Sequence, residues 1–132
     1  MKSLSIEICD VTLRDGEQTP GVSFSCKEKV EIASLLDEIG IEMIEAGFPA
    51  VSENEKHCVK TIANLGLDAR ISGFCRAKKP DIQTAIDCGV DMVSIFIPTS
   101  ELHVRLKFKK PREQVLEDSL EMIDYARDHG VL

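Results

Sequence analysis

Long apolar runs are absent from the sequence. None of its hydrophobic stretches approaches the ~20 residues that a membrane-spanning helix needs. The opening residues also lack the apolar segment of a secretory signal peptide. We therefore expect a cytoplasmic protein that does not bind membranes.

Positive charge is also scarce. The sequence has 16 Lys and Arg residues against 23 Asp and Glu residues, a formal net charge of −7 at pH 7. Nucleic acids and anionic membrane surfaces are bound through clustered Lys and Arg side chains. The charge balance therefore argues against a nucleic-acid partner.

The cysteines lack the spacing of a redox or metal motif. Their number is odd, no two are arranged as C-x-x-C, and most lie within apolar segments, which favours reduced thiols over a disulfide framework. They are Cys9, Cys26, Cys58, Cys75 and Cys88.

The residues that are present suffice for one domain. A chain of 132 residues with 43% apolar content can bury a single core, so we predict one domain over residues 1–132. Short β-prone runs alternate with longer segments that carry apolar residues every three or four positions. This alternation indicates repeated βα units.

The first two units share the same signals. Strands are predicted over residues 4–10 and 41–45, and each precedes an S-x-x-E capping box, an apolar helical pattern and a terminating glycine. The boxes are Ser25 with Glu28 and Ser52 with Glu55, and the glycines are Gly40 and Gly66.

Two more units follow. Strands are predicted over 69–74 and 90–97, the second so apolar that it should be covered on both faces. The helices run from Pro80 to Gly89 and from about Pro111 to Gly130, and residues 131–132 look like the start of another strand. Strict alternation predicts an α/β fold with a parallel sheet, here about four units of a (β/α)8 TIM barrel.

Parallel βα architecture places ligand sites beyond the carboxyl ends of the strands. Arg14 and Asp15 lie at such an end, where an anion-binding guanidinium could stand beside a metal-binding carboxylate. A simple Arg–Asp pair within a loop is the alternative. The four strand ends comprise residues 12–18, 45–49, 74–76 and 98–103.

Three ordered motifs at these ends resemble a known family. Residues 10–22 (DVTLRDGEQTPGV), 44–49 (IEAGFP) and 97–103 (IPTSELH) are similar to segments of the synthases that condense acetyl-CoA with a 2-oxo acid. These are the isopropylmalate, citramalate and homocitrate synthases. Residues 18–24 and 46–53 resemble the homocitrate synthase type most, which favours 2-oxoglutarate as the substrate.

The resemblance implies a Claisen-type condensation and a role for several residues. Asp15 would bind a divalent metal cation (Mg, Mn or Zn), and Arg14 would stabilise negative charge that develops on oxygen. Glu45 would lie close to the metal and substrate, and Gln18 would add a hydrogen-bonding amide. The alternatives are that Glu45 pairs with a neighbouring cation and that Gln18 only caps loop backbone groups.

The later strand ends supply further candidates for substrate binding. Arg76 could bind the distal carboxylate of a dicarboxylic 2-oxo acid, or be a solvated loop residue. Thr99 could contact substrate or cap a turn. His103 opens a basic run, residues 103–110, that could meet the phosphates of CoA or simply form a solvated connection.

Other residues expected from the family are missing. Its members add two metal-binding histidines as an H-x-H pair, which this sequence lacks, and a catalytic acidic residue on a later strand. We therefore expect an incomplete site, with weak or absent metal binding and no activity by this chain alone. Half a barrel also exposes open sheet edges, so either a C-terminal half-barrel or self-association should cover them.

Two alternatives remain for the function. The chain could be an inactive half-barrel subunit whose role is assembly. It could also belong to a related lyase that runs C–C cleavage on the same fold, although residues 18–21 fit the synthases better.

Overall fold

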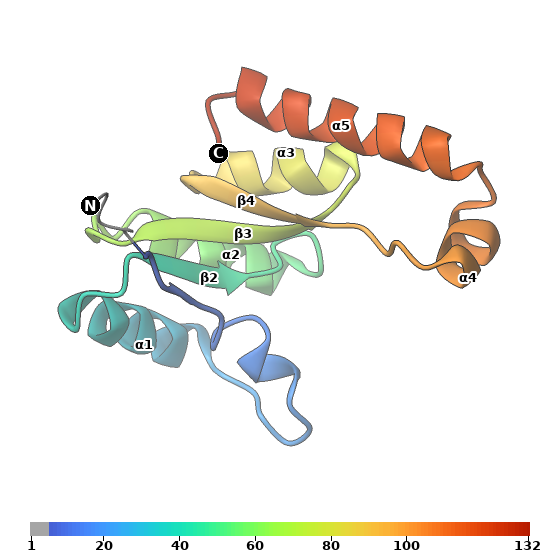
Figure 1. Ribbon diagram of the computed structural model, residues 1–132. Coiled ribbons are helices and arrows are strands. Elements are labelled where there is room, and N and C mark those ends of the chain that lie inside the picture. Colours follow the sequence, from blue (N-terminus) through green and yellow to red (C-terminus); the bar gives the residue numbers. More distant parts are fainter. Residues whose placement is uncertain (1–5) are drawn as a thin grey trace, which may run out of the picture.

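A computed structural model describes residues 6–132. Four strands form one parallel sheet in the sequential order β1-β2-β3-β4, which confirms the predicted α/β fold. The main elements are β1 (Cys9–Asp10), α1 (Cys26–Glu38), β2 (Met43–Gly47), α2 (Glu53–Ala63), β3 (Arg70–Arg76), α3 (Lys79–Cys88), β4 (Met92–Phe96) and α5 (Arg112–Asp128) (Figure 1).

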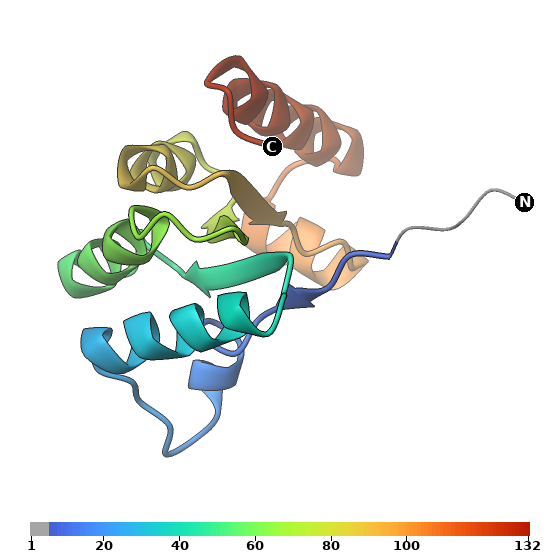
Figure 2. The ribbon, with the colours of Figure 1, turned by 90° about the vertical axis from the view of Figure 1, so that its left-hand side faces the viewer.

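The core lies between the sheet and its helices. Helices α1, α2 and α3 lie side by side along one face of the sheet (Figure 2). Ile44 and Ile71 on the strands and Val59, Ile62 and Ile82 on the helices are completely or almost completely buried. The apolar periodicity of the helices therefore identifies the face that each one buries.

The first strand is shorter than predicted. Residues 4 and 5 lie outside the described part of the chain, and Ile6 and Ile8 are exposed and precede the strand. β1 pairs with β2 only through Cys9 and Asp10, and just before it the backbone N–H of Ile8 bonds to the Glu42 carboxylate instead of a strand backbone. The prediction of a strand over 4–10 was thus too long.

The helix ends follow the local signals, with one exception. Ser25 and Glu28 form the complete predicted capping box at the start of α1, and Gly89 ends α3 with a φ of 81°. At α2, Ser52 accepts a hydrogen bond from the backbone N–H of Glu55, but the Glu55 carboxylate does not return to Ser52. The second capping box is therefore only half formed, because Glu55 has other partners.

The fourth strand is less covered than predicted. All five residues of β4 are partly or fully exposed, and Phe96 is 37% exposed. Helices cover one face of the sheet, and the other face remains open within residues 6–132, so the expectation of a strand buried on both faces was wrong. Leu132 lies beside β4, where its carbonyl accepts a hydrogen bond from Val93 N–H at 2.9 Å and its N–H donates to Asp91 O at 3.2 Å.

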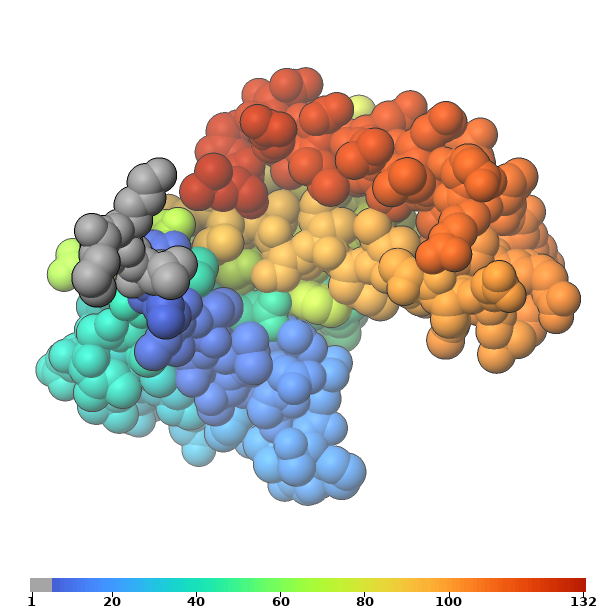
Figure 3. All heavy atoms as spheres, in the orientation of Figure 1, coloured from blue at the N-terminus to red at the C-terminus, as the bar shows by residue number. Residues whose placement is uncertain are grey.

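The loops after β1 and β4 carry short elements that were not predicted. These are η1 (Gly16–Gln18), α4 (Glu101–His103) and η2 (Val104–Phe108). The two loops project on either side of a concavity at the carboxyl end of the sheet (Figure 3). Among residues 6–132, none of the helices is long and apolar enough to cross a membrane.

The cysteines are free thiols in the described chain. Cys58, Cys75 and Cys88 are buried, and Cys26 is half-buried. Burial, with smaller effects of neighbouring charges, raises the pKa of Cys75 to about 12. The three buried thiols pack in the core as small apolar side chains.

Candidate functional site

The first two strand ends meet through an ion pair. Arg14, in the loop after β1, donates from Nε to Oε2 of Glu45 on β2 at 2.6 Å. Glu45 is only 3% exposed, and most of the Arg14 side chain is also covered. The two residues predicted to be catalytic are thus in direct contact, and the alternative expectation that Glu45 pairs with a cation is also met.

A row of three aromatic rings lies beside Arg14. The guanidinium of Arg14 lies 4.2 Å from the ring centre of Phe74, which stacks on Phe96 with ring centres 5.0 Å apart. Phe48 meets Phe74 edge to face at 5.3 Å. Of these rings, Phe74 is in cation–π contact with the guanidinium. The sequence analysis missed this row, although a phenylalanine at three successive strand ends could have indicated it.

Asp15 offers one oxygen ligand at the rim. Its side chain is 61% exposed, and Oδ1 lies 3.0 Å from Nη1 of Arg14. An exposed carboxylate beside a guanidinium fits one ligand of a divalent cation, since Mg²⁺ and Mn²⁺ prefer carboxylate oxygens and keep several waters. Within residues 6–132, no three His, Cys, Asp or Glu side chains are grouped as a metal site.

Gln18 shares a hollow with Arg14. The hollow has a volume of about 230 Å³ and lies between the loop after β1 and the start of α2. Gln18 is the last residue of η1, whose turn begins directly after Asp15. The loop therefore brings Arg14, Asp15 and Gln18 to one place. The other residues that line the hollow are Glu17, Phe48, Val51, Ser52 and Glu55.

Arg76 lies at the same end of the sheet but is engaged. It donates from Nε and Nη2 to the two carboxylate oxygens of Asp81, in the first turn of α3, at 2.6 and 2.9 Å. These hydrogen bonds and the charge of Asp81 raise the pKa of Arg76. Its side chain remains 45% exposed, so a carboxylate that binds Arg76 would share it with Asp81.

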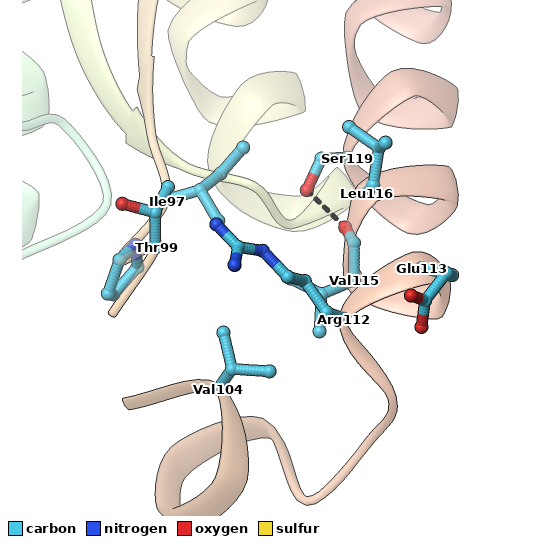
Figure 4. A pocket seen from close by; sticks show the side chains of 9 residues that line it. Ile97, Thr99, Val104, Arg112, Glu113, Val115, Leu116 and Ser119 are labelled. Atoms are coloured by element: carbon cyan, nitrogen blue, oxygen red, sulfur yellow. Dashed lines mark hydrogen bonds between the residues drawn. The ribbon is translucent and has the colours of Figure 1, made fainter. Parts of the chain in front are cut away.

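Thr99 lines a second hollow, between the end of β4 and α5. This hollow has a volume of about 390 Å³ and is mostly apolar, and the side chain of Arg112 extends into it toward Ile97 and Thr99 (Figure 4). Ser100, rather than Thr99, caps the following turn: its Oγ accepts a hydrogen bond from the backbone N–H of His103. Thr99 itself is exposed at the edge of this hollow.

The basic run lies beside the rim, and some of its side chains contact other residues of the chain. His103 Nδ1 lies 2.7 Å from Ser100 Oγ. Lys107 lies 5.7 Å from the ring centre of Phe96, and Lys110 pairs with Asp118 on α5 at 2.5 Å. Apart from Val104 and Phe108, the residues of the run are exposed, as the alternative of a solvated connection expects.

Comparisons with known proteins identify the family of the chain. The profile of the HMGL-like family matches residues 5–131. The chain therefore belongs to the HMGL-like family, as the three motifs indicated. HMG-CoA lyase from Bacillus subtilis has a similar structure, with a TM-score of 0.76 and 18% identity over 96% of this chain and 44% of that chain. At that identity the likeness supports the TIM-barrel fold alone.

The chain is also similar to curated synthases. The chain is 55% identical to homocitrate synthase AksA from Methanosarcina acetivorans over 98% of its length. It is 50% identical to 2-isopropylmalate synthase from Methanocaldococcus jannaschii over 96% of its length. The chain spans about a third of the length of the first relative and about a quarter of the second, 32% and 24%. A probable 2-isopropylmalate synthase from Methanopyrus kandleri is also 55% identical, so identity does not separate the two types.

Proposed function

We propose that the chain forms the N-terminal half of the active site of a synthase that condenses acetyl-CoA with a 2-oxo acid, with 2-oxoglutarate as the favoured acid. The main support is the contact of Arg14 with Glu45 and Phe74 at the rim of the sheet. In this reaction the acetyl methyl group loses a proton, its carbon bonds to the keto carbon, and water cleaves the thioester to release CoA.

Arg14 would supply fixed positive charge. Negative charge develops on the keto oxygen of the acid as the new C–C bond forms. A guanidinium that is already oriented by Glu45 and Phe74 needs little reorganisation to stabilise that charge. Glu45 keeps Arg14 in place, and the hollow beside Gln18 offers an amide to a substrate oxygen.

Asp15 would hold a divalent cation, which would supply positive charge to the carboxylate and keto oxygens of the acid. The geometry of residues 6–132 fits one ligand and not a complete set. Further ligands would then come from outside these residues. We propose accordingly that this chain by itself binds metal weakly and lacks activity, and that a C-terminal half-barrel or a second copy covers its open edge.

The choice of 2-oxo acid depends on whether Arg76 binds a second carboxylate of the substrate. For 2-oxoglutarate, Arg76 would bind the distal carboxylate while still paired with Asp81. The double hydrogen bond to Asp81 favours a second candidate, an isopropylmalate or citramalate synthase, whose acid has an aliphatic side chain. The rings of Phe74 and Phe96 offer an apolar surface for such a side chain.

Acetyl-CoA would approach from the end of β4. Thr99 and Arg112 line the mostly apolar hollow there, and the basic run from His103 to Lys110 lies next to it. An apolar surface suits the pantetheine arm, and Lys and Arg side chains suit its phosphates. This placement supports the predicted contact between the basic run and CoA.

A chimera provides the test. The chain would replace the matched segment of homocitrate synthase AksA from Methanosarcina acetivorans, to which it is 55% identical. Release of CoA thiol would be measured with 2-oxoglutarate, 2-oxoisovalerate and pyruvate. We expect release with one of these acids and a loss of about 100-fold for Arg14→Lys, because a lysine ammonium does not reproduce an oriented guanidinium that is stacked on a ring. Arg127→Lys, at the distant end of α5, is the matched control and should retain activity.

The same assay separates the two candidate substrates. Arg76→Leu should raise the KM for 2-oxoglutarate and leave that for the other acids unchanged if Arg76 binds the distal carboxylate. A chimera that releases no CoA thiol with any of the three acids would contradict the proposed function, and Arg14→Lys with full activity would remove Arg14 from it.

A further inference from the structure

A buried lysine is connected to the segments that carry Arg14 and Glu45. Lys29, on α1, is only 1% exposed, although a lysine ammonium is strongly hydrated in water. Its Nζ lies 2.6 Å from Oε2 of Glu17 and 2.8 Å from Oε2 of Glu55, and it donates to the backbone carbonyl of Leu13 at 3.4 Å. These acceptors match the three donors of an ammonium, so the buried charge is both paired and hydrogen-bonded.

The ammonium is maintained in its charged form. Burial lowers the pKa of Lys29, but the hydrogen bonds and charges of Glu17 and Glu55 outweigh this effect, so the pKa is raised. Lys29 is therefore a cation at neutral pH.

One carboxylate connects Lys29 to the loop after β1. The second oxygen of Glu17, Oε1, accepts a hydrogen bond from the backbone N–H of Phe24 at 3.0 Å. Lys29 also contacts the carbonyl of Leu13, whose side chain is completely buried. One end of the loop that carries Arg14 and Asp15 thus binds the ammonium directly, and the other end binds it through the Glu17 carboxylate.

The other carboxylate connects Lys29 to the end of β2. Glu55 Oε1 accepts from the backbone N–H of Phe48 at 3.2 Å, three residues after Glu45. Gly47 leaves room for this oxygen, since a Cβ there would lie 2.0 Å from Glu55 Oε1. Glu17 and Glu55 also line the hollow that contains Arg14 and Gln18.

We propose that Lys29 is a positioning residue of the site, which holds the loop of Arg14 and the strand end of Glu45 at the separation where these two side chains meet. Lys29 acts on Arg14 and Glu45 indirectly, through the Glu17 and Glu55 carboxylates and the backbone groups that they and Lys29 bind. Glu17 and Glu55 are, by the same argument, parts of this support rather than acids or bases of the reaction. The geometric part of the proposal is independent of the reaction, whereas its catalytic consequence rests on the proposed function.

The test uses the Arg14 Nε–H signal in a proton–nitrogen NMR spectrum of the chain. In the unsubstituted protein this proton should exchange slowly with water and be shifted by the Phe74 ring, and Arg14→Lys assigns it. Lys29→Met, which removes the charge at similar length, should move the signal toward that of a free arginine and speed its exchange. Lys27→Met is the matched control, since Lys27 is on the same helix but its side chain is 85% exposed.

A second variant keeps the test decisive if Lys29→Met does not fold. Glu55→Gln removes one charge and retains Lys29, and it should displace the same signal in the same direction by a smaller amount. An unchanged Arg14 signal in a folded Lys29→Met protein would overturn the proposal. If only Glu55→Gln folds, an unchanged signal in that variant would do so.

The catalytic consequence is measured in the chimera. Lys29→Met should lower kcat more than it changes the KM for the 2-oxo acid, because Lys29 is buried and its ammonium binds Glu17 and Glu55. An unchanged kcat would refute this consequence. If the unsubstituted chimera has no activity, the proposed function fails, and the Arg14 signal still decides the role of Lys29.

Discussion

The support of the site by Glu55 predicts that Gly47 tolerates no side chain. Gly47 has a φ of 156°, and an added Cβ would lie 2.0 Å from Glu55 Oε1 and 3.1 Å from Val59 Cγ2. A glutamate end is normally flexible enough to withdraw. Here Lys29 holds both of its oxygens, at 2.9 and 2.8 Å, so withdrawal would break a buried ion pair.

The magnitude follows from two effects. Overpacking a core typically costs about 1–3 kcal/mol, and an L-residue in an unfavourable positive-φ conformation costs about 1–2 kcal/mol. Gly47→Ala should therefore lower the free energy of unfolding by about 2–5 kcal/mol, as the sum of these two effects. Gly66→Ala is the matched control, because Gly66 has a φ of 75° and no atoms within 4 Å of an added Cβ. It should lose only the backbone part, about 1–2 kcal/mol.

Urea denaturation of both variants provides the measurement. A further comparison places Gly47→Ala in a Glu55→Ala background, where the cost of the added methyl group should fall toward that of Gly66→Ala, because the nearest clashing atom is gone. Equal costs for Gly47→Ala and Gly66→Ala would refute the reasoning. So would a cost of Gly47→Ala that is the same with and without the Glu55 side chain.

Two further predictions concern the helix cap and the buried thiols. Ser25→Ala removes the N-cap of α1 and should lower the free energy of unfolding at pH 7 by about 1 kcal/mol, measured in urea. The hydrogen bonds of Ser25 lower the pKa of Glu28. The ionised carboxylate therefore stabilises the fold above the ordinary glutamate pKa, and this stabilisation is lost as the pH falls through the lowered pKa. An equal difference in the free energy of unfolding between variant and parent at pH 7 and pH 3 would contradict this. Because burial raises the pKa of Cys75 to about 12, iodoacetamide at pH 8 should label exposed Cys9 well before Cys75, as followed by mass spectrometry, and equal rates would show that Cys75 is accessible.

The features of the fold that the sequence predicts correctly are those set by residues close together in the chain. The order of strands and helices follows from apolar periodicity, and residues such as Ser25 and Gly89 end their helices through bonds within a few residues. The shortness of β1 and the exposure of β4 could not be predicted in this way. Both depend on which neighbours cover each strand, and that information is not local.

The same distinction applies to the site. Arg14 and Glu45 could be placed at one rim because parallel strands bring their carboxyl ends together. Their additional partners could not: the Phe74 ring beside Arg14 and the Asp81 carboxylate on Arg76 come from later elements. Glu55 looks like a capping residue in the sequence, yet its carboxylate binds Lys29 on a different helix. Tertiary contacts thus decide which of several local roles a charged side chain takes.

The location of a bound cation tests the central claim most directly. Crystals of the chimera, grown with Mn²⁺ and the 2-oxo acid that it uses, would reveal the metal by its anomalous scattering. The account predicts Mn²⁺ at coordination distance from the Asp15 carboxylate, with the acid between the metal and the Arg14 guanidinium. A metal bound elsewhere, or an acid remote from Arg14 and Glu45, would contradict the assignment of this rim as half of a synthase active site.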